Sequence, residues 1–173
     1  MTTHPLIATL QFDKESQHYF NGLRQHYFPK AINYLDAHLT LFHHLPPSQP
    51  RILNEIENAV RIGPFAVNVT GVYHTGFGVA FQLQSKPLVQ LHQYLHEAFY
   101  SWLTPQDRQP FRPHITIQNK VSAEESKQLT AELQQTFKPF TAIGTGINLW
   151  EYHNGPWKHQ EFFGFQHHHA VGL

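Results

Sequence analysis

The chain has 173 residues, with twelve basic and twelve acidic side chains and a pI near 7.3. Hydrophobic residues make up 40% of it, which is enough for one domain with its own core, and the length excludes two full-sized domains. The balanced charge argues against binding of long duplex DNA, and the lack of cysteine excludes disulfides, thiolate nucleophiles and cysteine-based zinc sites.

The first half of the chain predicts two helices and four strands. Apolar side chains recur at intervals of three and four from Tyr19 to Tyr27, which is typical of one helix face, and Pro29 ends the helix. Prolines after residue 45 end the second strand. The expected elements are strand 5–12, helix 14–28, a strand from 37, helix 48–61, and a hairpin of strands 65–73 and 79–83.

The second half repeats this order. Ser122 and Glu125 form a capping box in front of an apolar helical pattern, and Asn154-Gly155 is a strong hairpin signal. The expected elements are helix 86–103, strand 112–117, helix 122–137, and strands 140–152 and 157–165. We therefore predict a single α+β domain made by internal duplication, with antiparallel sheets flanked by helices and two lobes or repeat units at about 14–84 and 86–166.

A short motif occurs once in each half, as Ala-His-Leu-Thr-Leu at residues 37–41 and Arg-Pro-His-Ile-Thr-Ile at residues 112–117. Because side chains alternate along a strand, the His and Thr of each copy share one face while the aliphatic residues point into a core. Chance alone predicts roughly 0.25 copies of this His-apolar-Thr-apolar pattern in so histidine-rich a chain. Two copies in equivalent strands therefore indicate a functional pair.

Two imidazoles and two hydroxyls can surround one phosphate. Cleavage of a phosphodiester needs a base for the attacking oxygen, an acid for the leaving oxygen, and donors for the phosphoryl charge. His38 and His114 can supply the base and the acid, and Thr40 and Thr116 can donate to the non-bridging oxygens. The near-identical motifs do not say which histidine is the base.

These paired motifs resemble those of the two-histidine phosphoesterase superfamily, the LigT-like or 2',5'-RNA ligase-like proteins. The resemblance covers nearly the whole chain, including the duplicated elements and the late hairpin between Trp150 and Trp157. It implies a bilobal pseudo-symmetric α+β fold with a central cleft. It also implies metal-independent opening of 2',3'-cyclic phosphates of nucleotides or RNA ends, and in some members reversible 2',5' ligation.

Carried over to this sequence, the resemblance assigns His38 and His114 as the acid/base pair and Thr40 and Thr116 as phosphate donors. Other side chains are weaker candidates for contact with phosphate, sugar or base, because they share the motif's strand face or belong to the aromatic hairpin. These candidates are Arg112, Gln118, Lys120, Phe42, Trp150 and Tyr152.

The remaining histidines favour plainer interpretations. His167, His168 and His169 are consecutive and cannot all converge on one ion, so we expect a solvated tail. His92 and His96 are four apart on a helix without a metalloprotease pattern, and we assign them to its polar face.

The predicted partner is a small nucleotide or RNA end. No run of eighteen apolar residues and no signal-peptide pattern occurs, so we expect a cytoplasmic monomer without a membrane partner. We expect neither a metal nor an organic cofactor. Two alternatives stay open at this point: a nucleotide- or RNA-end-binding module without useful turnover, and a histidine-ligated metallohydrolase, which a chelator would inactivate.

Overall fold

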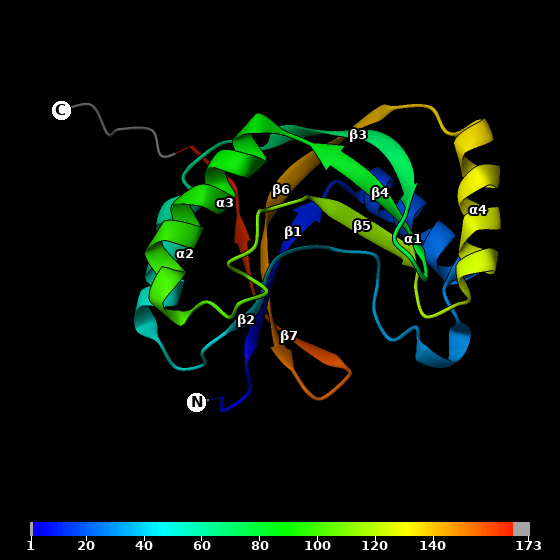
Figure 1. Ribbon diagram of the computed structural model, residues 1–173. Coiled ribbons are helices and arrows are strands. Elements are labelled where there is room, and N and C mark those ends of the chain that lie inside the picture. The colour runs from blue at the N-terminus through cyan, green and yellow to red at the C-terminus, as the bar shows by residue number, and fades with distance from the viewer. Residues whose placement is uncertain (1, 168–173) are drawn as a thin grey trace.

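The computed structural model describes residues 2–167, which form seven strands and four α-helices (Figure 1). The strands are β1 (Leu6–Phe12), β2 (Leu39–Leu45), β3 (Phe65–His74), β4 (Val79–Gln84), β5 (His114–Gln118), β6 (Phe140–Tyr152) and β7 (Trp157–Gly164). The helices are α1 (Lys14–Tyr27), α2 (Pro50–Ala59), α3 (Lys86–Phe99) and α4 (Ala123–Thr136), with short 3-10 turns at Lys30–Ile32 and Tyr100–Trp102. His168 and His169 of the expected tail lie outside the described residues.

Local sequence signals set the boundaries of these elements. The Asp13 carboxylate accepts the Ser16 N–H at 3.1 Å and begins α1, while the Ser122 hydroxyl accepts the Glu125 N–H at 3.1 Å and begins α4. Asn154 has a φ of 57° and is followed by a glycine that also has positive φ, as the tight turn between β6 and β7 requires.

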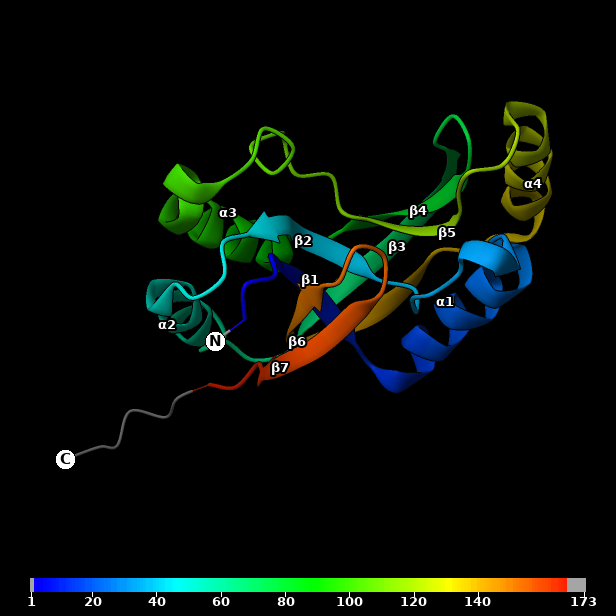
Figure 2. The ribbon, with the colours of Figure 1, turned by 90° about the horizontal axis from the view of Figure 1, so that it is seen from below.

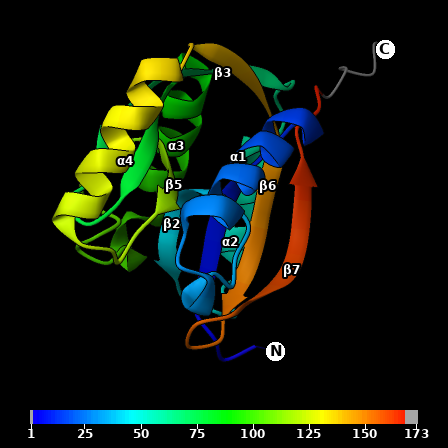
Figure 3. The ribbon, with the colours of Figure 1, turned by 90° about the vertical axis from the view of Figure 1, so that its right-hand side faces the viewer.

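All seven strands belong to one antiparallel sheet in the order β2-β1-β6-β3-β4-β5, with β7 paired to β6. β6 is long enough to serve two groups of strands: its first residues pair with β3 and its later residues pair with β1 and β7. The sheet curls, so that its two end strands, β2 and β5, lie near each other (Figures 2 and 3). The predicted bilobal α+β fold is confirmed.

Helices cover the sheet in two pairs on opposite sides of the molecule (Figure 1). α1 lies on β5 and α4 on β3 and β4, whereas α3 packs on α2 and its aromatic residues reach β2. One lobe thus joins β1, β2, β7 and the end of β6 with α2 and α3, and the other joins β3, β4, β5 and the start of β6 with α1 and α4. The sequence units 14–84 and 86–166 each contribute strands and helices to both groups, and the internal duplication stays a prediction.

The hydrophobic core includes one histidine that we expected on a helix surface. His92 has only 7% of its surface exposed, and its ring stacks between Phe42, at 4.9 Å, and Phe111, at 3.8 Å. The assignment of His92 to a polar face was therefore wrong. Its neutral imidazole packs as a flat aromatic ring between two others.

Both motif strands carry a β-bulge directly after the threonine. In β2, Thr40 pairs with Thr9 but Phe42 pairs with Ala8, so one residue of β2 has no partner on β1. In β5, Thr116 pairs with Ala80 but Gln118 pairs with Val79, which leaves one residue over at the equivalent place. Each bulge reverses the alternation of faces, because an extra residue shifts the following side chains to the other side.

None of the helices among the described residues has the length and apolar character that crossing a bilayer requires.

Candidate active site

The two motif histidines are held in the same way at the starts of β2 and β5. His38 Nδ1 lies 2.8 Å from the carbonyl oxygen of Asp36, and His114 Nδ1 lies 2.8 Å from that of Arg112. A carbonyl only accepts, so Nδ1 carries the proton in each ring and Nε2 is the nitrogen left for a ligand. β2 and β5 lie near each other, and the two rings are close enough for the charge of His114 to act on the pKa of His38.

Helix α1 fixes the backbone of both motifs. The Gln17 amide donates to the Ala37 carbonyl at 2.7 Å, and the Asn21 side-chain oxygen accepts the Ala37 N–H at 2.9 Å, immediately before His38. One turn further along the same helix, the Arg24 guanidinium donates to the Thr116 carbonyl at 3.0 Å. A single helix therefore sets the relative position of the two motifs.

The environment of His38 favours its neutral form. Burial lowers the pKa of His38 to about 4, against the opposing effect of the hydrogen bond to the Asp36 carbonyl. The nearby charges of Arg24, His43 and His114 lower this pKa further. At neutral pH the His38 imidazole is therefore uncharged, with a lone pair on Nε2.

Arg24 is a buried cation beside the site that the sequence analysis missed. It is 5% exposed, and its Nε donates to the Asn33 side chain at 3.0 Å. Burial lowers the pKa of Arg24 to about 10, and the charge of Asp36 opposes that effect. The available signal was its place on the apolar stripe of α1, one position from Leu23, where a charged residue is out of pattern.

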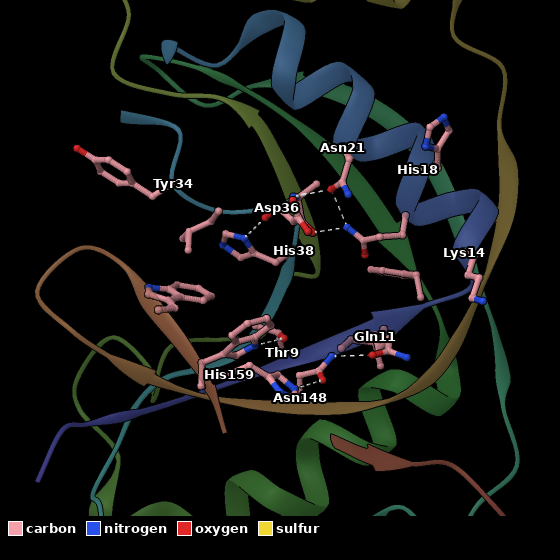
Figure 4. Close-up of a pocket in the computed structure, with 17 residues that line it drawn as sticks. Thr9, Gln11, Lys14, His18, Asn21, Tyr34, Asp36, His38, Asn148 and His159 are labelled. Atoms are coloured by element: carbon pink, nitrogen blue, oxygen red, sulfur yellow. Dashed lines mark hydrogen bonds between the residues drawn. The ribbon is translucent and has the colours of Figure 1, made fainter. Parts of the chain in front are cut away.

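A cavity of about 660 Å³ opens beside His38, between α1 and the concave face of β1, β6 and β7 (Figure 4). Polar side chains cross its floor: the Asn148 amide donates to Gln11 at 3.0 Å, and His159 Nε2 lies 2.8 Å from the Asn148 oxygen. Lys14 and His18 of α1 stand at the other wall. Most of these residues carry no sequence motif; only the fold brings them together.

Aromatic residues of the late hairpin form another wall of the cleft. The Trp157 ring lies 4.7 Å from the His38 ring, and Trp150 lines the same cavity while its indole N–H donates to the Thr9 hydroxyl at 2.9 Å. Tyr152 lies beyond Trp157 and lines a second, neighbouring cavity. The structure thus brings Trp150 and Tyr152 near the motifs, together with Trp157.

Two of the weaker candidates, both beyond the bulges, are buried. Phe42 is fully buried in the core and stacks on His92, and Gln118 is 3% exposed. Both residues were placed on the face of the motif histidine by the alternation of side chains, which holds only for a regular strand. The assignment of Phe42 and Gln118 to that face is therefore corrected. The buried Gln118 Oε1 has no hydrogen-bond partner among the described residues.

The two basic candidates lie at opposite ends of β5. Arg112 is exposed next to His114 and lines a cavity of about 700 Å³ with Tyr73 and Gln82. Lys120 is exposed beyond the far end of the strand, six residues and roughly 20 Å from His114 at the usual rise of a strand. Arg112 is therefore nearer to His114 along the chain than Lys120 is, and a substrate contact for either residue stays a prediction.

Thr40 and Thr116 are partly exposed at equivalent places in their strands, two residues after the histidines. Within residues 2–167, no cluster of three or more His, Asp or Glu side chains is arranged to hold a metal ion.

Known structures share the fold of this chain. The chain matches the crystal structure of TT0787 of Thermus thermophilus with a TM-score of 0.68 and 17% identity, covering 95% of this chain and 100% of the other. It also matches E. coli LigT complexed with NADP+, with a TM-score of 0.61 and 17% identity over 94% and 98% of the two chains. A structure of E. coli LigT complexed with 3'-AMP matches with a TM-score of 0.60 and 15% identity over 94% and 98%.

No curated protein matches the sequence. Residues 12–156, which include both motifs, match the sequence model of one family. The chain is a member of the 2'-5' RNA ligase superfamily.

Proposed function

We propose that the protein is a metal-independent phosphoesterase that opens 2',3'-cyclic phosphates of nucleotides or RNA ends. The observation that carries this proposal is the matched pair of imidazoles, each with Nδ1 bound to a carbonyl two residues back and Nε2 left for the cleft. The same residues would serve 2',5' ligation, in which the 5'-hydroxyl of another ribose replaces water as the group that attacks the cyclic phosphate and the freed ribose oxygen takes up the proton.

We assign the base role to His38. Its pKa of about 4 keeps Nε2 unprotonated at neutral pH, as a group that must accept a proton requires. The acid role then falls to His114. This division of roles is what the symmetric motifs alone leave open.

The reaction follows from these roles. His38 Nε2 accepts a proton from a water molecule as its oxygen attacks the phosphorus of the cyclic phosphate. The bond from phosphorus to one ribose oxygen breaks, and His114 gives its Nε2 proton to that oxygen. Thr40 and Thr116 donate hydrogen bonds to the two non-bridging oxygens, which gain charge as the water attacks.

The aromatic and polar walls beside His38 suit the rest of a nucleotide. Trp157 offers a face on which a base can stack, a contact worth about 1 to 3 kcal/mol for any base. The side chains of Gln11, Asn148 and His159 offer donors and acceptors to the same ligand. Structures of E. coli LigT have been solved with 3'-AMP, ATP and NADP+, and we extend nucleotide binding to this chain.

The test is a screen of 2',3'-cyclic nucleotides, RNA with cyclic ends and linear 2',5' dinucleotides, with EDTA present throughout. His38→Ala and His114→Ala should each lower turnover about 10²- to 10⁴-fold, with little change in thermal stability because both rings are partly exposed. Full activity in either variant would refute the mechanism. Binding without product across the panel would identify a binding module, and inactivation by EDTA would identify a metal enzyme.

A further inference from the structure

A third histidine, His43, lies toward the other end of β2 and lines a second cavity, which shares Trp157 with the cavity beside His38. Leu41 and Phe42 are both buried, and His43 follows them on the exposed side with Ile7, Tyr152 and Trp157 around one cavity. The bulge after Thr40 produces this arrangement, since in a regular strand residues 40 and 43 would lie on opposite faces. His43 is therefore on the face of the motif histidine.

A buried carboxylate holds the His43 ring. The Asp107 side chain is 1% exposed, and it accepts hydrogen bonds from His43 Nδ1 at 2.9 Å and from the backbone N–H groups of His43 and His44 at 2.9 and 3.0 Å. Burial raises the pKa of Asp107, but the hydrogen bonds from His43 outweigh it and hold the pKa below its usual value. The ionised carboxylate fixes Nδ1 as a donor and leaves Nε2 of His43 for a ligand.

The cavity in front of His43 has a volume of about 420 Å³. Its walls include Ile7, Pro105, Tyr152 and Trp157, and His44, Thr104 and Gln106 add polar groups. Trp157 also lines the larger cavity beside His38, so its indole separates two binding volumes (Figure 2 shows the β6–β7 turn beside β2). The His38 ring packs on Trp157 and so lies next to the indole that separates the two cavities.

Two cavities on either side of a phosphate site fit a ligand that continues past one nucleotide. We propose that the cavity at His43 binds the second nucleotide of an RNA 3' end, with its internucleotide phosphate on His43 Nε2 and its base or ribose against Tyr152 and Trp157. The terminal nucleoside occupies the cavity beside His38, and the cyclic phosphate lies between the motif histidines. This inference rests on the proposed function and narrows its substrate class to RNA ends over free mononucleotides.

The chemistry of the two sites differs in a way that supports this division. His38 is surrounded by atoms of both lobes and by cationic neighbours that disfavour its protonation. The His43 side chain is 42% exposed and its nearest charged partner, the Asp107 carboxylate, lies on the Nδ1 side, so the Nε2 edge of the ring is open to a ligand. A phosphate at Nε2 of His43 is then held by a positioned donor.

The experiment measures binding of product analogues, so that it needs no turnover. Isothermal titration calorimetry compares 3'-AMP, which has one phosphate, with the dinucleotide ApAp, which has the same terminal phosphate and an internucleotide phosphate. The wild-type protein should bind ApAp about tenfold more tightly, the gain expected for one added charge-assisted hydrogen bond. Equal affinities for the two ligands would overturn the proposal.

Two substitutions separate the binding role of His43 from a structural one. In His43→Asn the amide nitrogen can still donate to Asp107 in place of Nδ1, but no group stands where Nε2 was. In His43→Gln the amide nitrogen takes the place of Nε2 and the bond to Asp107 is lost. His43→Asn should remove the tenfold preference for ApAp and leave 3'-AMP affinity unchanged, whereas His43→Gln should keep part of the preference.

His26→Asn, at an exposed histidine near the end of α1, is the control and should behave as wild type. An equal loss of affinity for both ligands in His43→Asn would show that the residue acts only on structure and would refute the subsite. The proposed function has a separate readout, the opening of ApA with a terminal 2',3'-cyclic phosphate. If wild-type protein binds ApAp with the expected preference but leaves the cyclic phosphate intact, the subsite stands and the proposed function fails.

Discussion

Protonation of His92 should destabilise the protein at mildly acidic pH. The ring is buried between Phe42 and Phe111, and burial lowers the pKa of His92 to about 4, aided by the charge of His96. A hydrogen bond with the Leu41 backbone and the charge of Asp107 act in the opposite direction and are outweighed. In the unfolded chain the same imidazole returns to its ordinary pKa of 6.5.

The sign follows from the two pKa values. Between pH 6.5 and pH 4 the unfolded chain binds more protons than the folded protein, so the free energy of unfolding falls as the pH falls. At about 1.4 kcal/mol per pH unit, the loss amounts to about 3 kcal/mol in total, of which about 2 kcal/mol is reached by pH 5. Above pH 6.5 His92 contributes no pH dependence.

The assay is urea unfolding of wild-type protein and His92→Phe, followed by circular dichroism from pH 7.5 to pH 5. Phenylalanine keeps the aromatic stack but cannot be protonated, so the variant should gain about 2 kcal/mol relative to wild type across this range. His26→Phe, at an exposed position, controls for the loss of one imidazole. A difference between wild type and His92→Phe that is independent of pH would refute the reasoning.

Three further predictions concern the cleft. Thr40→Val and Thr116→Val keep the strand shape but remove a phosphate donor, and each should lower kcat about 10²- to 10³-fold at unchanged thermal stability. The value of kcat/KM, corrected for the folded fraction, should fall as the pH drops through about 4, because protonated His38 cannot accept a proton. If a variant without the His38 ring shows the same fall at the same pH, His38 is not the base. Asp107→Ala leaves two backbone N–H groups of β2 without their acceptor and should lower the free energy of unfolding by about 2 to 4 kcal/mol; urea unfolding that matches wild type would show that water replaces the carboxylate.

The order and type of the elements followed from periodicity, because each helix and strand carries its own apolar pattern and its own cap or turn. The pair of motifs also located the two histidines, since their spacing matched the duplicated units. Curling of the sheet was needed to bring β2 and β5 together, and a pattern within either strand holds no information on that curl.

The bulges mark where strand parity failed. Counting by twos from His38 selected Phe42, whereas the structure turns Phe42 into the core and His43 toward the cleft. The same error selected Gln118 in β5. A bulge leaves one residue of a strand without a partner on the neighbouring strand. Because its position depends on that neighbouring strand, the sequence of the motif strand alone does not reveal it.

Buried polar residues were the other group that sequence patterns did not reveal. Arg24 is a charged residue on the apolar stripe of α1, and His92 was assigned to the polar face of its helix, yet both are buried against residues from distant parts of the chain. Arg24 donates hydrogen bonds to the Asn33 side chain and the Thr116 carbonyl. The His92 ring stacks between two aromatic rings. Such partners are known only once the fold has placed them.

The long strand β6 has a mechanical consequence for the cleft. Gly144 pairs with Phe65 of β3 on one side and with Phe12 of β1 on the other, so the same stretch of backbone is bonded into both lobes. A rotation that opened or closed the two lobes would have to break hydrogen bonds between β6 and its neighbouring strands. The separation of the motif histidines is thus fixed when the protein folds. We expect a ligand to bind by fitting this fixed separation, without a closing movement of the two lobes.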